Sequence, residues 1–115
     1  MLKCLCNRKT YTKGETQMND KATFEQDRSR LIQAVLALKN EEECSAFFED
    51  IFTIQELHAI AQRLKVAGML KNGMTCQHIA EETGASTATI SRVNKCFHYG
   101  PGGYEIVLQR LEKEE

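Results

Sequence analysis

The sequence lacks several features that define large classes of proteins. No apolar run approaches the roughly 20 residues that a helix needs to cross a bilayer, so no membrane segment is predicted. The first six residues, Met1 to Cys6, contain no apolar stretch of the kind found in signal peptides. We therefore expect a cytoplasmic protein.

Regular cysteine spacing is also missing. The chain has five cysteines, at positions 4, 6, 44, 76 and 96. An odd number at irregular spacing argues for reduced thiols rather than a disulfide framework. Cys4 and Cys6 are separated by one residue, whereas zinc sites favour two to four. A metal or thiol sensor remains an alternative function for this protein. Such a sensor would use Cys76, His78, Cys96 and His98.

An excess of basic charge, usual at DNA-binding surfaces, is absent from the chain as a whole. The formal net charge is −1, but the charges are unevenly distributed. Residues 54–99 carry five basic and three acidic residues, whereas residues 100–115 carry two basic and four acidic ones. We expect the middle of the chain to face an anionic partner. No nucleophile has an evident base, so we expect no enzyme, no metal site and no cofactor.

The length of 115 residues predicts one domain. Residues 1–22 are polar and lack periodicity, and we expect a disordered leader there. Residues 23–115 show apolar residues at helical spacing and predict an all-α fold of five to six helices. Besides a helix-turn-helix at 75–97, helices are expected at about 24–39, 41–51, 54–70 and 104–112. Thr53 and Glu56 form a capping box at the start of the helix expected at about 54–70.

One stripe of the second expected helix is unusually aromatic. Its apolar residues fall at i, i+3, i+4, i+7 and i+8, and they are Cys44, Phe47, Phe48, Ile51 and Phe52. Large apolar stripes often mark interfaces, so a partner surface is one interpretation. An intrachain core is the other.

The segment from Thr75 to Phe97 has the pattern of a helix-turn-helix. Thr75 can cap a helix of seven to eight residues, which ends where Gly84 can adopt the left-handed conformation. Ser86 can cap a second helix, in which Ile90 and Val93 begin an apolar face. In such a motif the second helix can enter the major groove of DNA.

The other face of this second helix is small, polar or cationic, as close approach to DNA requires. Thr87, Ala88 and Ser91 are short, and hydroxyls such as that of Thr89 can bind phosphates or read bases through water. Arg92 and Lys95 supply positive charge. The alternative is an ordinary corner between two helices of a bundle, which has no need of such a face.

Several segments resemble the tryptophan repressor superfamily, and in particular its YerC/YecD branch. The resemblance covers about residues 24–111. It is carried by the segment Ala85-Ser86-Thr87-Ala88-Thr89-Ile90-Ser91-Arg92 together with Phe48-Glu49-Asp50, Ala61-Gln62-Arg63-Leu64, Glu81-Glu82-Thr83-Gly84-Ala85, Tyr99-Gly100 and Gly103-Tyr104. It implies an interlocked homodimer that binds double-stranded DNA. The positions that it implies to face DNA are Gln77, Thr87, Ala88, Thr89 and Ser91.

The resemblance also implies a site for a small-molecule corepressor, an amino acid. Arg63 and Arg92 match the two arginines that hold tryptophan in the tryptophan repressor, and Thr53 matches a threonine from the other subunit. Cys96 stands where a serine contacts the amino group of the ligand. Val93 stands where a glycine leaves room for the ligand in the tryptophan repressor. The binding of L-tryptophan to this protein is therefore in question.

The sequence therefore predicts a cytoplasmic, homodimeric transcriptional regulator, a repressor, that reads a pseudo-palindromic operator. Two alternatives from other classes are a helical protein-interaction module and the thiol or metal sensor. A DNA-binding fragment of an enzyme is a third, although 115 residues leave no room for a catalytic domain.

Overall fold

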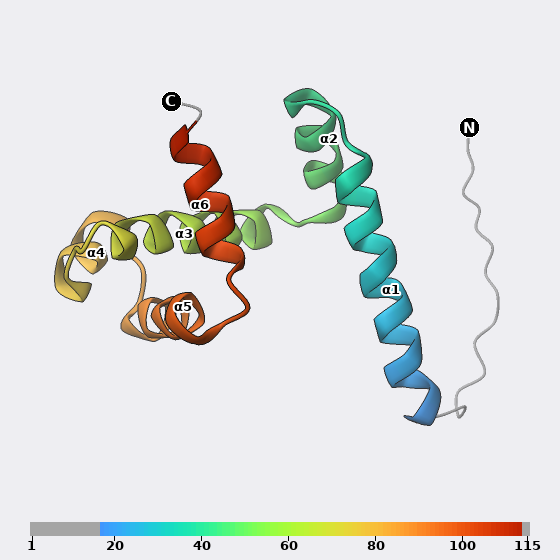
Figure 1. Ribbon diagram of the computed structural model, residues 1–115, viewed down its shortest axis with the longest axis horizontal. Helices are drawn as coiled ribbons and strands as arrows, with labels where there is room; N and C mark the ends of the chain where they lie inside the picture. Colours follow the sequence, from blue (N-terminus) through green and yellow to red (C-terminus); the bar gives the residue numbers. More distant parts are fainter. Residues whose placement is uncertain (1–16, 114–115) are drawn as a thin grey trace. The chain divides into compact units, whose positions relative to one another are not determined.

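The computed structural model describes the backbone of residues 17–113 and the side chains of residues 21–113. These residues form six α-helices and no strand, which confirms the predicted all-α fold. The helices are α1 (Gln17–Ala37), α2 (Glu41–Ile51), α3 (Ile54–Lys71), α4 (Cys76–Thr83), α5 (Thr87–Tyr99) and α6 (Gly103–Lys113), as labelled in Figure 1. Within this part of the chain, none of the helices combines the length and the apolarity that crossing a membrane would require.

The first helix begins earlier than the sequence predicts. We expected it to start at about Phe24, but α1 starts at Gln17, so residues 17–22 are helical rather than part of a disordered leader. No glycine or proline interrupts residues 17–23, and Met18, Lys21 and Ala22 are good helix formers. Adding a residue to an existing helix costs far less than starting a new one, so α1 extends through this stretch. Residues 1–16, the rest of the predicted leader, lie outside the described residues.

The chain divides into two compact units, residues 1–46 and residues 47–115. In the first unit α2 begins with a cap, because the backbone N–H of Glu43 donates to Asn40 Oδ1 at 2.8 Å. From Lys21 to residue 46 no side chain is buried. Five large apolar residues of α1 are between 42% and 78% exposed, and they are Phe24, Leu31, Ile32, Val35 and Leu36.

The second unit is built on α3, which packs against α4, α5 and α6 (Figure 1). All four helices and the turn after α4 contribute to one apolar core, whose burial stabilises the unit. The core consists of Val66 and Ala67 from α3, Ile79 from α4, Ala85 from the turn, Ile90 and Val93 from α5, and Leu108 from α6. This core fixes α5 against α3.

The last helix is attached to α3 by both packing and charge. Gly68 on α3 packs beside Leu108, and a Cβ built on this glycine would make an ordinary van der Waals contact with the Leu108 Cδ2 atom, at 3.7 Å. The Lys71 ammonium, at the end of α3, lies 3.4 Å from Glu112 Oε2 and 3.8 Å from Glu105 Oε1 on α6. Lys71 therefore faces carboxylates of α6.

The phenylalanine stripe is not a buried core in the single chain. Phe47, Phe48 and Phe52 are half-buried, and the rings of Phe48 and Phe52 meet edge to face at 5.4 Å between centroids. Ile51 is 46% exposed. The interpretation of this stripe as a partner surface stays a prediction.

Candidate nucleic-acid interface

The three residues predicted to define the helix-turn-helix have the predicted geometry. Thr75 caps α4, because its hydroxyl accepts the backbone N–H of His78 at 3.1 Å. Gly84 ends α4 with φ of 74°, a left-handed conformation that favours glycine. Ser86 caps α5, because its hydroxyl accepts the backbone N–H of Thr89 at 3.1 Å.

Two polar side chains, for which no structural role was predicted, hold the turn together. The Thr83 hydroxyl donates to the carbonyl of Ile79 at 2.8 Å and accepts the N–H of Ala85 at 3.1 Å. The side-chain amide of Gln62, on α3, donates to the carbonyl of Thr83 at 3.2 Å. The only signal for these contacts in the sequence is the polar Thr83 at the end of α4. Its partner on α3, Gln62, lies 21 residues earlier in the chain, so spacing does not reveal the pair.

Helix α5 has one face in the core and one face in solvent. Ile90 and Val93 are each 1% exposed, and Phe97 packs against the core. The opposite side is formed by exposed residues at i, i+1, i+4, i+5 and i+8, which we call the recognition face: Thr87, Ala88, Ser91, Arg92 and Lys95. An ordinary corner between helices does not require such a face.

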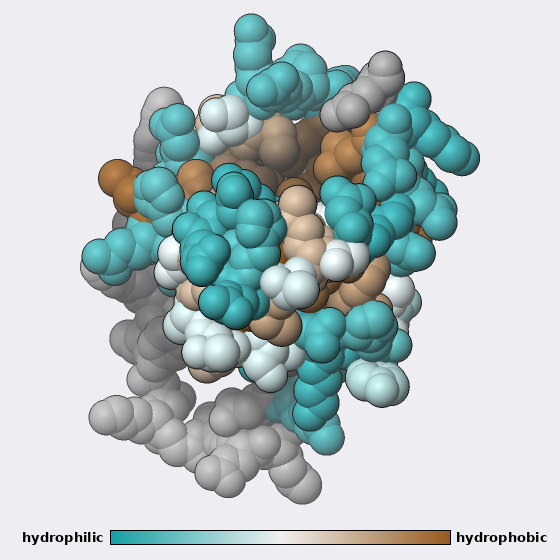
Figure 2. Space-filling model, turned by 90° about the vertical axis from the view of Figure 1, so that its left-hand side faces the viewer, coloured by the Kyte–Doolittle hydropathy of each residue, from teal (hydrophilic) through white to brown (hydrophobic). Residues whose placement is uncertain are grey.

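Two further residues predicted to contact DNA, Gln77 and Thr89, lie outside this face as defined. Gln77 is exposed in the first turn of α4. Thr89 is half-buried, and its hydroxyl accepts a hydrogen bond from the Ser86 hydroxyl at 3.1 Å. Figure 2 views the second unit from the side of α4, where residues of intermediate hydropathy, drawn white, gather beside hydrophilic ones, drawn teal.

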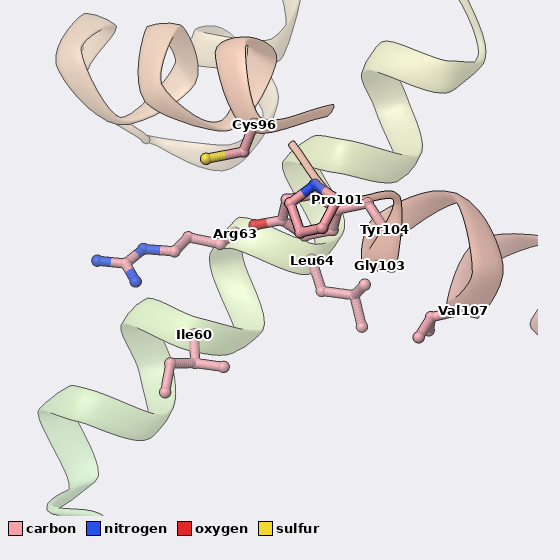
Figure 3. A pocket seen from close by; sticks show the side chains of 8 residues that line it. All are labelled: Ile60, Arg63, Leu64, Cys96, Pro101, Gly103, Tyr104 and Val107. Atoms are coloured by element: carbon pink, nitrogen blue, oxygen red, sulfur yellow. The ribbon is translucent and has the colours of Figure 1, made fainter. Parts of the chain in front are cut away.

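A pocket of about 560 Å³ opens between α3, α5 and α6. Its walls are mostly apolar and include Ile60, Leu64 and Val107. Figure 3 shows that the Arg63 guanidinium and the Cys96 sulfur lie toward the same side of this pocket. The structure thus brings together two of the four predicted ligand residues.

The other two predicted ligand residues do not line this pocket. Arg92 is exposed on the recognition face. Thr53 caps α3, where its hydroxyl accepts the N–H of Glu56 at 3.1 Å, while the carboxylate of Glu56 accepts the N–H of Thr53 at 2.9 Å. Val93, where the resemblance places a glycine, is 1% exposed and lies in the core.

The residues proposed for a metal or thiol sensor are spread over the second unit. His78 lies 3.8 Å from Glu82 on the exposed side of α4, whereas Cys96 lines the pocket. Among residues 17–113, no three His, Cys, Asp or Glu side chains come together as a metal ion would require. Cys4 and Cys6 lie outside the described residues.

Comparison with known proteins identifies the family. Residues 26–112 match the family described as Trp repressor protein. The chain belongs to the Trp repressor family. It is 51% identical over 86 residues to YerC of Bacillus subtilis (strain 168), a match that covers 75% of this chain and 83% of YerC.

Two solved structures agree with this membership of the Trp repressor family. A TrpR-like protein from Eubacterium eligens ATCC 27750 has a TM-score of 0.72 at 50% identity, over 76% of this chain and 90% of that one. A protein from Staphylococcus aureus has a TM-score of 0.71 at 40% identity, over 85% of this chain and 96% of that one. The predicted resemblance, including its YerC branch, is confirmed. The Trp repressor family consists of DNA-binding transcription regulators, not of enzymes.

Proposed function

We propose that this member of the Trp repressor family is a cytoplasmic, homodimeric repressor that binds a pseudo-palindromic operator in double-stranded DNA. The observation that carries this proposal is the division of α5 into two faces. Ile90 and Val93 anchor one face in the core, and the recognition face points to solvent. A helix held in this way can be inserted into the major groove as a rigid element.

The composition of the recognition face suits DNA. Short side chains such as Thr87, Ala88 and Ser91 allow the backbone of α5 to approach the base edges closely. Arg92 and Lys95 lie one to two turns further along and can neutralise phosphates, which releases counterions. The net charge of −1 for the whole chain is therefore no obstacle, because the recognition face itself carries two cations and no acidic residue.

The apolar surface that each unit leaves uncovered supports the proposed homodimer. In the first unit α1 exposes Phe24 and Leu36, and in the second unit α3 and α6 expose Ile54 and Leu111. Single chains rarely leave so many large apolar side chains in solvent, whereas a second copy could cover them. Two recognition helices related by a twofold axis would read half-sites about 34 Å apart, one turn of DNA.

We further propose that DNA binding does not require L-tryptophan. The pocket beside Arg63 and Cys96 could hold a small amphipathic molecule such as an amino acid, which supports a corepressor site. Two features oppose tryptophan as that molecule: Val93 is packed in the core, and Arg92 does not line the pocket. Isothermal titration that detects micromolar L-tryptophan binding, together with a DNA affinity that depends on it, would contradict this part of the proposal.

Gel shifts on genomic fragments at several salt concentrations test the central proposal. We expect a sequence-dependent shift that weakens as salt rises. Arg92→Ala and Thr87→Ala should each weaken it, whereas Arg110→Ala, on the exposed surface of α6, serves as the matched control. Full affinity in both recognition-face variants would refute the assignment. The complete absence of DNA binding would favour a helical protein-interaction module instead.

The proposed dimer has its own test. Light scattering or sedimentation equilibrium should give twice the chain mass of 13.1 kDa. Leu31→Glu, which places a charge among the exposed apolar residues of α1, should shift the mass toward that of one chain. Glu25→Gln is the control, because Glu25 is an exposed, charged residue of the same helix. This variant should leave the mass unchanged.

A further inference from the structure

We propose that the first turn of α5 selects thymine at a defined position of each half-site by contact with its 5-methyl group. This inference rests on the proposed DNA-binding function and deepens it. Thr87 and Ala88 are the first two residues of α5, both are exposed, and each side chain carries a methyl group, that of Thr87 beside its hydroxyl. The N-terminal residues of a recognition helix are the ones that reach base edges.

The first turn has little else with which to read a base. Its four residues are Thr87, Ala88, Thr89 and Ile90, and none carries the amide or guanidinium that forms paired hydrogen bonds to adenine or guanine. Ile90 is buried in the core. Thr89 is half-buried and its hydroxyl accepts a hydrogen bond from Ser86, so less of this side chain is available to a base than of Thr87 or Ala88.

The methyl groups of Thr87 and Ala88 therefore form the apolar contact surface of this turn, beside the Thr87 hydroxyl. In the major groove thymine is the base that presents a methyl group, at C5. Contact between methyl groups removes apolar surface from water and is favourable without any directional bond. The longer donors Arg92 and Lys95 lie beyond the first turn and are available to phosphates or to other base pairs. The thymine contact thus gives specificity where side chains that form paired hydrogen bonds to a base are missing.

Replacement of thymine by uracil tests this inference, since uracil pairs with adenine but lacks the methyl group. A bound DNA sequence would first be selected by the wild-type protein from a random pool. Each thymine would then be replaced by deoxyuridine, one position at a time, and affinity measured by fluorescence anisotropy. We expect at least one position in each half-site where affinity falls about fourfold, the effect of one buried methyl group.

Variants of α5 then identify the protein side of the contact. Thr87→Ser keeps the hydroxyl and removes only the methyl group, and Ala88→Gly removes the other methyl group. At least one of them should bind the thymine and uracil sites with equal affinity. Thr83→Ser makes the same chemical change as Thr87→Ser at the end of α4, outside the predicted DNA contacts, and keeps the hydroxyl that bonds to Ile79 and Ala85, so it should keep the preference for thymine. Circular dichroism melting would show that each variant is folded.

The outcomes separate this inference from the proposed function. If the wild-type protein selects no DNA, the proposed function fails and the inference with it. If the selected site is bound equally well with thymine and with uracil at every position, the inference is overturned while the DNA-binding function stands. If a variant does not fold, the comparison of thymine and uracil sites with the wild-type protein still decides.

Discussion

The side-chain amide of Gln62 on α3 donates a hydrogen bond to the backbone carbonyl of Thr83, the last residue of α4, at 3.2 Å. This carbonyl belongs to the end of a helix, where backbone acceptors have no partner within the helix. The bond links α3 to the turn between α4 and α5. The orientation of the recognition helix thus depends on a polar contact as well as on the apolar core.

Removal of this contact should destabilise the second unit. We expect Gln62→Ala to lower the free energy of unfolding by about 1 kcal/mol, the net contribution of a typical hydrogen bond. Urea denaturation followed by circular dichroism would measure it. Gln109→Ala is the control, because Gln109 is an exposed residue within α6. Equal stability of the wild-type protein and Gln62→Ala would show that water replaces the amide at no cost.

Gly84 provides a second prediction, based on backbone conformation alone. A Cβ built on Gly84 meets nothing within 4 Å, so the cost of a side chain comes only from its φ of 74°. We expect Gly84→Ala to lower stability by about 1–2 kcal/mol, and Gly84→Asn by less, since Asn tolerates the left-handed region. Thermal melting would rank the three proteins.

The control for this prediction is Gly103→Ala. A Cβ on Gly103 also meets nothing within 4 Å, but Gly103 opens α6 without a positive φ. Alanine there should leave stability unchanged or raise it, because it restricts the unfolded chain. A loss as large as that of Gly84→Ala would contradict the conformational explanation.

Local signals in the sequence were sufficient to predict the elements of this fold. The capping hydroxyls of Thr53, Thr75 and Ser86 and the left-handed Gly84 act on backbone atoms within four residues of themselves, and all four have the predicted geometry. Helical spacing likewise identified Ile90 and Val93 as core residues. These features depend on near neighbours in the chain, which is why sequence alone shows them.

Features that depend on distant residues could not be predicted from pattern. The pairing of Gln62 with Thr83 and that of Lys71 with Glu112 each join helices far apart in the sequence. The start of α1 was misplaced because helix extension past Phe24 needs no apolar residue. The half-buried position of Thr89 depends on the rotation of α5 against α3, which spacing alone does not fix.

The ion pairs of Lys71 give a prediction that depends on salt. Lys71→Met should keep the packing of the aliphatic chain and remove the attraction to Glu105 and Glu112. We expect a loss of about 0.2–1 kcal/mol at low ionic strength, because the two carboxylates are half-exposed or more. The loss should shrink at 1 M salt, where charges are screened within about 3 Å.

Urea denaturation at the two salt concentrations would measure this difference. Lys65→Met is the control, since Lys65 is an exposed lysine of the same helix. A loss for Lys71→Met that does not change with salt would assign the effect to packing rather than to charge.

Substitution of Ser86 should separate the stability of α5 from its affinity for DNA. Ser86→Ala removes the cap and should cost about 1 kcal/mol of stability. Ser86→Asp keeps a cap, and its negative charge interacts favourably with the N-terminus of α5. The same charge would face the phosphates of bound DNA. Stability should therefore be lower in Ser86→Ala, whereas DNA affinity should be lower in Ser86→Asp.

This reversal between the two variants is the decisive result. Thermal melting would give the order of stability, and fluorescence anisotropy on a selected DNA site would give the order of affinity. The loss of affinity in Ser86→Asp should diminish as salt rises, because it arises from repulsion between charges. If both variants lost affinity only in proportion to their loss of stability, the N-terminus of α5 would not lie beside phosphates, and another part of the helix-turn-helix would have to approach the DNA backbone.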